Sequence, residues 1–66
     1  MEEMWLARDE NGELYLFIDD VAPKKKSNKW IGRLFSTIIE IPKRHFPKIK
    51  WSDEVPTKVK LEIVQE

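Results

Sequence analysis

The apolar and polar positions between Met4 and Ile18 form two short apolar runs on either side of a turn signal. That signal is Asn11 followed by Gly12, two residues that accept the positive φ angles of tight hairpin loops. Apolar runs of this length around such a pair are typical of a β-hairpin. We therefore predict a two-stranded hairpin over residues 4–18, against which the rest of the chain must pack.

The register of this hairpin decides which side chains share a face of the sheet. With a three-residue loop over residues 10–12, Trp5 lies opposite Phe17 and Ala7 lies opposite Tyr15. These four residues then form an aromatic face, and the other face is aliphatic, made of Met4, Leu6, Leu14, Leu16 and Ile18. A two-residue loop shifts the pairing by one, so that Trp5 and Ala7 join the leucines. We favour the three-residue loop because it separates aromatic from aliphatic side chains.

Either register leaves two apolar faces, so the hairpin must be covered on both sides, or covered on one and offered to a partner on the other. The segment that follows is polar, and Pro23 cannot donate to a strand ladder. The run KKKSNK over residues 24–29 concentrates positive charge. We expect this run to be a solvated loop and the most mobile part of the chain.

Residues 29–41 support two competing predictions. Apolar residues recur at helical spacing from residue 30 to residue 39, with Ser27 or Asn28 as a cap, which favours an amphipathic helix. An interior Gly32 and the β-branched residues within 37–41 favour strands instead. We predict two short strands, 29–33 and 36–41, with Gly32 at a bend or bulge.

The remainder of the chain predicts one helical turn and a terminal strand. Two prolines bracket residues 43–46, which fit a single helical turn because Pro42 suits a first helical position. Residues 48–51 alternate charged and apolar, so we expect a brief extended segment with Ile49 and Trp51 facing inward, then a turn over 52–56. From Thr57 to Val64 the alternation returns, with lysines on the outer face. We predict an edge strand whose lysines discourage pairing with other chains.

These elements predict a single mainly β domain over residues 1–66: a small curled antiparallel sheet or partial barrel with one short helical turn. A chain of this length is near the size at which one hydrophobic core is only marginally sufficient, so a homo-oligomer is one way to complete it. The absence of cysteine excludes disulfides and thiol chemistry and suits a reducing compartment. With no secretory signal and no apolar run near the roughly 20 residues that span a bilayer, we expect a cytoplasmic protein without a membrane partner.

The net charge of zero conceals a strong segregation of charge along the chain. Residues 1–20 hold seven acidic and one basic residue, residues 21–50 hold nine basic and one acidic, and residues 51–66 hold four acidic and two basic. The basic middle can fold against the acidic hairpin, pair with the acidic ends of a neighbouring subunit, or meet an external anion. Neutralisation within the subunit is the simplest of these three explanations.

Two stretches of the chain, WLARDENGELYLF and IEIPKRHFPKIKWSDEVP, resemble a family of small uncharacterised proteins found in bacterial genomes and in their phages and mobile elements. The resemblance covers about half of the chain and rests on features that specify a fold: a turn glycine, paired aromatics and a proline-bracketed turn. The family has no assigned activity, so it implies no catalytic residues. It implies a setting in which short non-enzymatic proteins often bind and block a host component.

Few side chains suggest catalysis. His45 is the only histidine, and no nucleophile or metal partner is placed beside it by the sequence. The serines lie in no nucleophile motif, and the adjacent acids 19–20 and 53–54 fall at turns, where carboxylates usually cap or face solvent. We therefore predict no enzyme, no catalytic or metal-binding residues and no cofactor.

The basic middle segment interleaves aromatic residues, an arrangement that holds single-stranded nucleic acid and nucleotides, although so small a domain also needs these rings for its core. We predict first a non-enzymatic binding or inhibitor module that docks on a host protein, and second an anion binder for single-stranded nucleic acid or a nucleotide signal. An enclosed nucleotide pocket of about 300 Å³ or more would have to lie between subunits. The residues predicted to contact a protein partner are Trp5, Tyr15, Phe17, Lys24, Lys25, Lys26, Lys29, Trp30 and Arg33. The residues predicted for the anion site are Lys43, Arg44, Lys48, Lys50 and Trp51.

Overall fold

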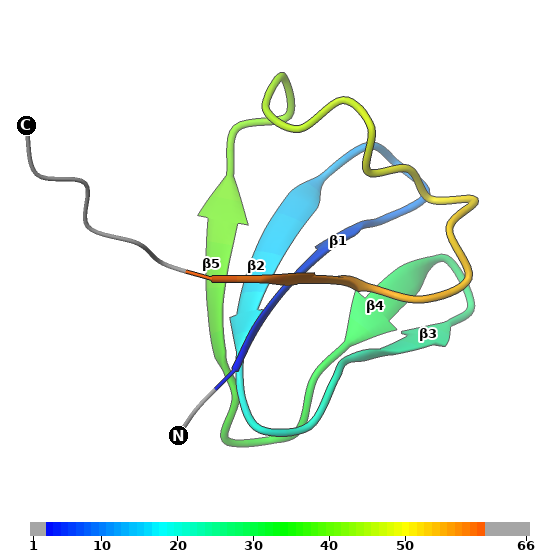
Figure 1. Cartoon of the computed structure of the whole chain (residues 1–66). Helices are drawn as coiled ribbons and strands as arrows, with labels where there is room; N and C mark the ends of the chain where they lie inside the picture. Colours follow the sequence, from blue (N-terminus) through cyan, green and yellow to red (C-terminus); the bar gives the residue numbers. More distant parts are fainter. Residues whose placement is uncertain (1–2, 61–66) are drawn as a thin grey trace, which may run out of the picture.

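A computed structural model describes residues 3–60, which form six β-strands in two antiparallel sheets (Figure 1). The larger sheet has the strand order β5-β2-β1-β6, and the smaller one pairs β3 with β4. The predicted mainly β fold is confirmed, and the two sheets do not close into a barrel. The strands are β1 (Met4–Arg8), β2 (Leu14–Ile18), β3 (Lys24–Lys26), β4 (Lys29–Ile31), β5 (Thr37–Ile41) and β6 (Thr57–Val59).

The β1–β2 hairpin has the predicted three-residue loop. The amide of Asp9 donates to the carbonyl of Glu13 at 2.8 Å, and the amide of Gly12 donates to the carbonyl of Asp9 at 3.0 Å. Gly12 has a φ of 93°, in the left-handed region that glycine adopts most readily. Trp5 pairs with Phe17 and Ala7 with Tyr15, so the preferred register is confirmed and the two-residue loop is wrong.

The aliphatic face of the hairpin is covered by the long connection between β5 and β6. This connection arches over the ends of β1 and β2 that meet at the hairpin loop (Figure 1). It brings Ile49 into a buried cluster with Leu6 and Leu14. The partly buried side chains of Leu16, Ile41 and Val59 pack around this cluster.

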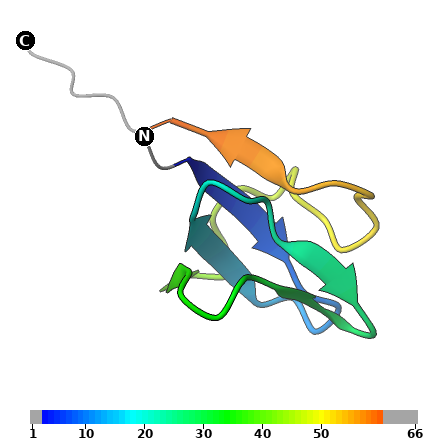
Figure 2. The ribbon, with the colours of Figure 1, turned by 90° about the horizontal axis from the view of Figure 1, so that it is seen from below.

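The aromatic face is covered by the β3–β4 hairpin, which lies beside β1 in Figure 2. Trp30 on β4 is buried together with Ala7 and Phe17, and Trp5, Tyr15 and Trp51 pack around them. The backbone amide of Trp30 donates to Oδ1 of Asp9 at 2.8 Å, and its indole Nε1 donates to the carbonyl of Arg8 at 3.1 Å. These two bonds attach the small sheet to the end of β1 without a shared strand ladder.

The basic run 24–29 is a hairpin, so the prediction of a loop is wrong, although all six residues are solvent-exposed as expected. Ser27 and Asn28 form its turn, with Ser27 at a φ of 54°, and Lys26 pairs with Lys29. Burial of Trp30 in the aromatic cluster stabilises this hairpin, and its cross-strand neighbour Lys25 lies over the Trp30 ring, which outweighs the low strand propensity of lysine.

The two strands predicted within 29–41 are confirmed, although both are shorter than expected, and the helix alternative is wrong. β4 ends at Ile31 because Gly32 turns against the core. A Cβ on Gly32 would lie 3.0 Å from both Cδ2 of Phe17 and Oγ of Ser36. The glycine therefore marks a close approach of the backbone to the aromatic cluster.

The predicted helical turn over 43–46 is wrong. The amide of His45 donates to the carbonyl of Pro42 at 3.0 Å in an isolated turn, and Phe46 follows with a φ of 52°, which prevents helical continuation. Residues 48–51 also form turns in place of the expected extended segment, although Ile49 and Trp51 do face inward as predicted.

The terminal strand β6 lies at an edge of the larger sheet, as predicted. Its predicted continuation from Leu61 to Val64 falls outside the described residues. Between residues 3 and 60 the structure has no helix that is long and apolar enough to cross a membrane.

Candidate binding face

The outer surface of the β3–β4 hairpin gathers three lysines. Because Lys25 and Trp30 face inward, strand alternation turns Lys24, Lys26 and Lys29 outward together with Ile31. Lys24 pairs with Ile31, and Lys26 pairs with Lys29 across the short sheet. No carboxylate of residues 3–60 lies within ion-pair distance of these three lysines. We call this surface, with the groove described next, the basic face.

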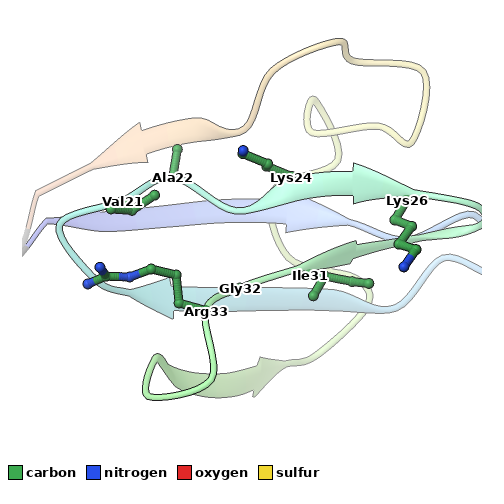
Figure 3. A pocket seen from close by; sticks show the side chains of 7 residues that line it. All are labelled: Val21, Ala22, Lys24, Lys26, Ile31, Gly32 and Arg33. Carbon is green, nitrogen blue, oxygen red and sulfur yellow. The ribbon is translucent and has the colours of Figure 1, made fainter.

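An open groove of about 380 Å³ crosses the basic face (Figure 3). Val21 and Ile31 are the exposed apolar side chains that line it. The rest of its lining comes from Ala22, Lys24, Lys26, Gly32 and Arg33. The groove thus combines an apolar surface with three cationic side chains at its margin.

Arg33, at the margin of the groove, is held by the carboxylate of Asp19. Its Nε donates to Oδ2 of Asp19 at 2.9 Å, and its Nη2 donates to Oδ1. Asp19 is buried and also accepts a hydrogen bond from the hydroxyl of Ser36. The hydrogen bonds from Arg33 and Ser36 hold the pKa of Asp19 far below its ordinary value, and Asp19 in turn raises the pKa of Arg33. Asp19 therefore anchors the guanidinium of Arg33, although the Arg33 side chain is 60% exposed.

Lys25 is exposed but lies on the other side of β3 from the basic face, with its Nζ over the rings of Trp30 and Trp51. Its Nζ donates to the carbonyls of Trp51 at 2.5 Å and Asp53 at 2.9 Å, and it lies 4.1 Å from the centroid of the Trp51 ring. These contacts tie β3 to the connection that precedes β6. The assignment of Lys25 to partner contact stays a prediction, and Lys25 lies on the opposite side of β3 from the basic face.

The aromatic residues predicted to meet a partner are packed inside the domain. Phe17 is 2% exposed and Trp30 is 6% exposed, so neither can be a contact surface. Trp5 and Tyr15 are half-buried against them. Burial raises the pKa of the Tyr15 phenol above its ordinary value, and the nearby carboxylate of Glu40 raises that pKa further. The hairpin therefore offers no bare aromatic face, because β3 and β4 cover it.

The residues predicted for an anion site are only partly available. Lys43 forms an ion pair with Glu13 at 3.3 Å. The ring of Trp51 is already in contact with a cation, because Nζ of Lys25 lies over it. Arg44, Lys48 and Lys50 are exposed along the same connection. An aromatic side chain is also exposed there, that of Phe46, whose ring centroid lies 6.2 Å from that of His45.

The structure supports the first explanation for the segregated charge in part. Arg33 and Lys43 from the basic middle pair with acids of the hairpin segment, and Lys58 pairs with Glu3. The three outward lysines of the basic face are not neutralised in this way within residues 3–60.

Sequence reasoning missed two features that organise the surface. Arg8 inserts its guanidinium into the turns of residues 43–49, and the available signal was its position as the single base among seven acids. The second feature is the loop between β4 and β5, where Leu34 is 89% exposed and Phe35 is 92% exposed. Their apolar character suggested burial, and nothing in the sequence signalled the opposite.

Comparison with known proteins provides no guide to function, because no family model, curated protein or solved structure matches the chain significantly.

Proposed function

We propose that this chain is a small non-enzymatic binding module that docks on an acidic protein surface through its basic face. The observation that carries the proposal is an apolar groove lined by Lys24 and Lys26, with Lys29 on the same face of the small sheet and no carboxylate partner for these lysines within residues 3–60. An apolar side chain of the partner fills the groove between Val21 and Ile31. Carboxylates beside that side chain then meet the lysines, which favours acidic partners and speeds encounter.

The rigidity of the basic face favours such docking. The β3–β4 hairpin is held by the two bonds of Trp30 to the end of β1, by the bonds of Lys25, and by the Asp19–Arg33 pair at its base. A face that is ordered before binding loses less conformational entropy when the partner arrives. In the phage or mobile-element setting that the resemblance implies, the module acts in the cytoplasm by covering a surface that a host protein needs.

Neither the histidine nor the buried carboxylate of the described residues is placed as a catalytic group would be. His45 is exposed, and its ring lies beside that of Phe46. Asp19, the buried carboxylate, already accepts hydrogen bonds from Arg33, Ser36 and the amide of Val21. A carboxylate that is held as an anion in this way is a structural counter-ion and a poor proton donor.

A second candidate function, anion binding, is favoured by the exposed ring of Phe46 beside Arg44 and Lys48. Nucleic acid bases stack on such rings, and the cations track phosphates. The basic face itself lacks an exposed ring, because Trp30 is buried beneath it. Stacking and charge therefore meet on the β5–β6 connection and not at the groove.

A matched pair of charge reversals tests the proposed function. The double variant Lys24→Glu and Lys26→Glu inverts the basic face, and the double variant Arg44→Glu and Lys48→Glu makes the same charge change on the β5–β6 connection. The wild type and both variants are immobilised and exposed to host lysate, and a protein retained by the wild type is then purified for kinetic measurement. We expect association to slow more than tenfold for the first variant and little for the second.

Two results contradict this proposal. Equal binding by the wild type and the Lys24 and Lys26 variant would remove the basic face from the function. Binding to a single-stranded oligonucleotide that is lost only in the Arg44 and Lys48 variant, and that weakens steeply with salt, would support the anion-binding function instead.

A further inference from the structure

Within residues 3–60, β5 has a free strand edge, and Glu40 is the single charged residue of this strand. β5 pairs with β2 on one side only, and four of its five residues are exposed. Natural proteins protect such edges with lysine, proline or a bulge, and β6 at the opposite edge carries Lys58. β5 reads Thr-Ile-Ile-Glu-Ile, without a basic residue or a proline. Its exposed isoleucines point to both faces of the sheet, because Ile38 and Ile39 are adjacent.

The hydrogen-bonding groups on this edge follow from the register. Asp9 and Glu13 are a hydrogen-bonded pair, so alternation makes Ala7–Tyr15 and Trp5–Phe17 hydrogen-bonded pairs as well. The intervening residues of β2 therefore direct their backbone groups to β5, where Leu16 meets Ile39. The N–H and C=O groups of Ile38 and Glu40 consequently face away from β2, toward the free edge.

We propose that two copies of this chain pair antiparallel through β5, about a two-fold axis at Ile38, and so join their two large sheets into one. In this register Ile38 lies opposite Ile38 of the second copy and forms a hydrogen-bonded pair with it. Glu40 lies opposite Ser36, and Ile41 lies at the level of Phe35. The partner strand is identified as a second copy because the edge is complementary to itself in this register.

Apolar surface and charge both match across the axis. Ile38, 50% exposed in the single chain, is covered by its own copy, and the exposed Phe35 gains an apolar neighbour in Ile41. Glu40 comes to Ser36, whose amide is bonded to the carbonyl of Arg33. The two bonds of Arg33 to Asp19 use Nε and Nη2, which leaves Nη1 for a second carboxylate. In the proposed dimer Glu40 of each copy therefore lies near the exposed guanidinium of the Asp19–Arg33 pair of the other copy, once on each side of the axis.

The neighbouring registers are less favourable. A two-fold axis at Ile39 places Glu40 opposite Ile38, and an axis at Glu40 places two carboxylates opposite each other. A net charge of zero also removes any general repulsion between copies. The interface uses none of Lys24, Lys26 and Lys29 and shares Arg33 with the margin of the groove, so the charge reversals at Lys24 and Lys26 test docking without changing the dimer interface.

A single introduced cysteine tests both the dimer and its register, because the chain has no cysteine of its own. Opposite residues in a hydrogen-bonded antiparallel pair have Cα atoms about 5.5 Å apart, within the range that a disulfide spans. We expect Ile38→Cys to give a disulfide-linked dimer under mild oxidation at least tenfold faster than Glu40→Cys. The two Glu40 positions lie four residues apart along the paired strands, about 13 Å, which is too far for a disulfide.

Sedimentation of the full chain over a range of concentrations measures the dimer without oxidation. We expect a reversible dimer for the wild type and for the control Thr57→Lys on the β6 edge, and a monomer for Ile38→Lys with unchanged circular dichroism. If Ile38→Lys does not fold, Glu40→Lys, which inverts the charge facing Arg33, is expected to weaken dimerisation at least tenfold. A wild type that stays monomeric at millimolar concentration, or equal cross-linking of the two cysteine variants, overturns the inference.

Discussion

Arg8 and Ile49, which lie 41 positions apart in the sequence, are joined by a hydrogen bond of 2.6 Å from Nε of the arginine to the carbonyl of the isoleucine. The guanidinium also donates to the carbonyls of Gly12, Lys43, His45 and Phe46 at 2.8 to 3.2 Å. All five N–H groups of the fork thus meet backbone oxygens. Arg8 thus satisfies backbone carbonyls in the turns of residues 42–49, which have no neighbouring strand to pair with. These turns bring Ile49 to the aliphatic core.

Replacing Arg8 by lysine should destabilise the domain by about 2 kcal/mol or more, because one ammonium cannot reach five carbonyls and some are left without a donor. Urea unfolding followed by tryptophan fluorescence measures the change. The control is Arg44→Lys, at an exposed position of the same connection, which should leave the midpoint unchanged. Equal midpoints for the wild type and the Arg8 variant would show that the carbonyl contacts contribute little.

Two adjacent lysines of β3 should respond differently to the same substitution. Lys25→Met removes the bonds to the carbonyls of Trp51 and Asp53 and the charge over the Trp51 ring, so we expect a loss of about 1 kcal/mol. Lys24→Met alters only the outer surface and should leave stability within about 0.5 kcal/mol of the wild type. Thermal unfolding of both variants checks this. A larger loss of stability for Lys24→Met than for Lys25→Met would mean that Lys24, and not Lys25, points toward the aromatic cluster.

Gly32→Ala should destabilise the domain although Gly32 has no positive φ. Its new Cβ would lie 3.0 Å from Cδ2 of Phe17, a buried ring that has little room to move. Overpacking of this kind costs about 1–3 kcal/mol. The near-ultraviolet circular dichroism of the aromatic cluster should change with the unfolding midpoint, and an unchanged spectrum with unchanged stability would contradict the close approach.

The parts of the fold that the sequence predicted are those set by local chemistry. The Asn11–Gly12 turn determines the first hairpin, and alternation then separates its aromatic and aliphatic faces. The errors lie where distant contacts decide. Three lysines form β3 because Lys25 finds carbonyls 26 and 28 positions away, and residues 43–46 abandon a helical turn because their carbonyls are bonded by Arg8. Lys24, Lys26 and Lys29 were named as contact residues from charge alone. That Lys25 points to the opposite side of β3 could be known only from the orientation of the strand in the structure.

The pair of Asp19 and Arg33 predicts how stability depends on pH. The native pKa of Asp19 lies far below its ordinary value, because Arg33 and Ser36 donate hydrogen bonds to the ionised carboxylate. Between that low value and the ordinary value of about 3.9, the unfolded chain binds a proton that the native chain does not. The stabilisation is therefore complete above about pH 5 and is lost progressively as the pH falls below 4.

The variant Asp19→Asn isolates this contribution from that of the other carboxylates. It should be less stable than the wild type at pH 7, because Arg33 loses its counter-ion, and the difference in unfolding free energy should shrink as the pH is lowered to 2.5. Urea unfolding at pH 7, 4 and 2.5 measures that difference. The same change at the neighbouring exposed Asp20 controls for the substitution itself and should cost less stability at pH 7. A constant difference for Asp19→Asn from pH 7 to 2.5 would mean that the carboxylate is not held as an anion by Arg33 and Ser36, and that the arginine at the margin of the groove is not fixed in place.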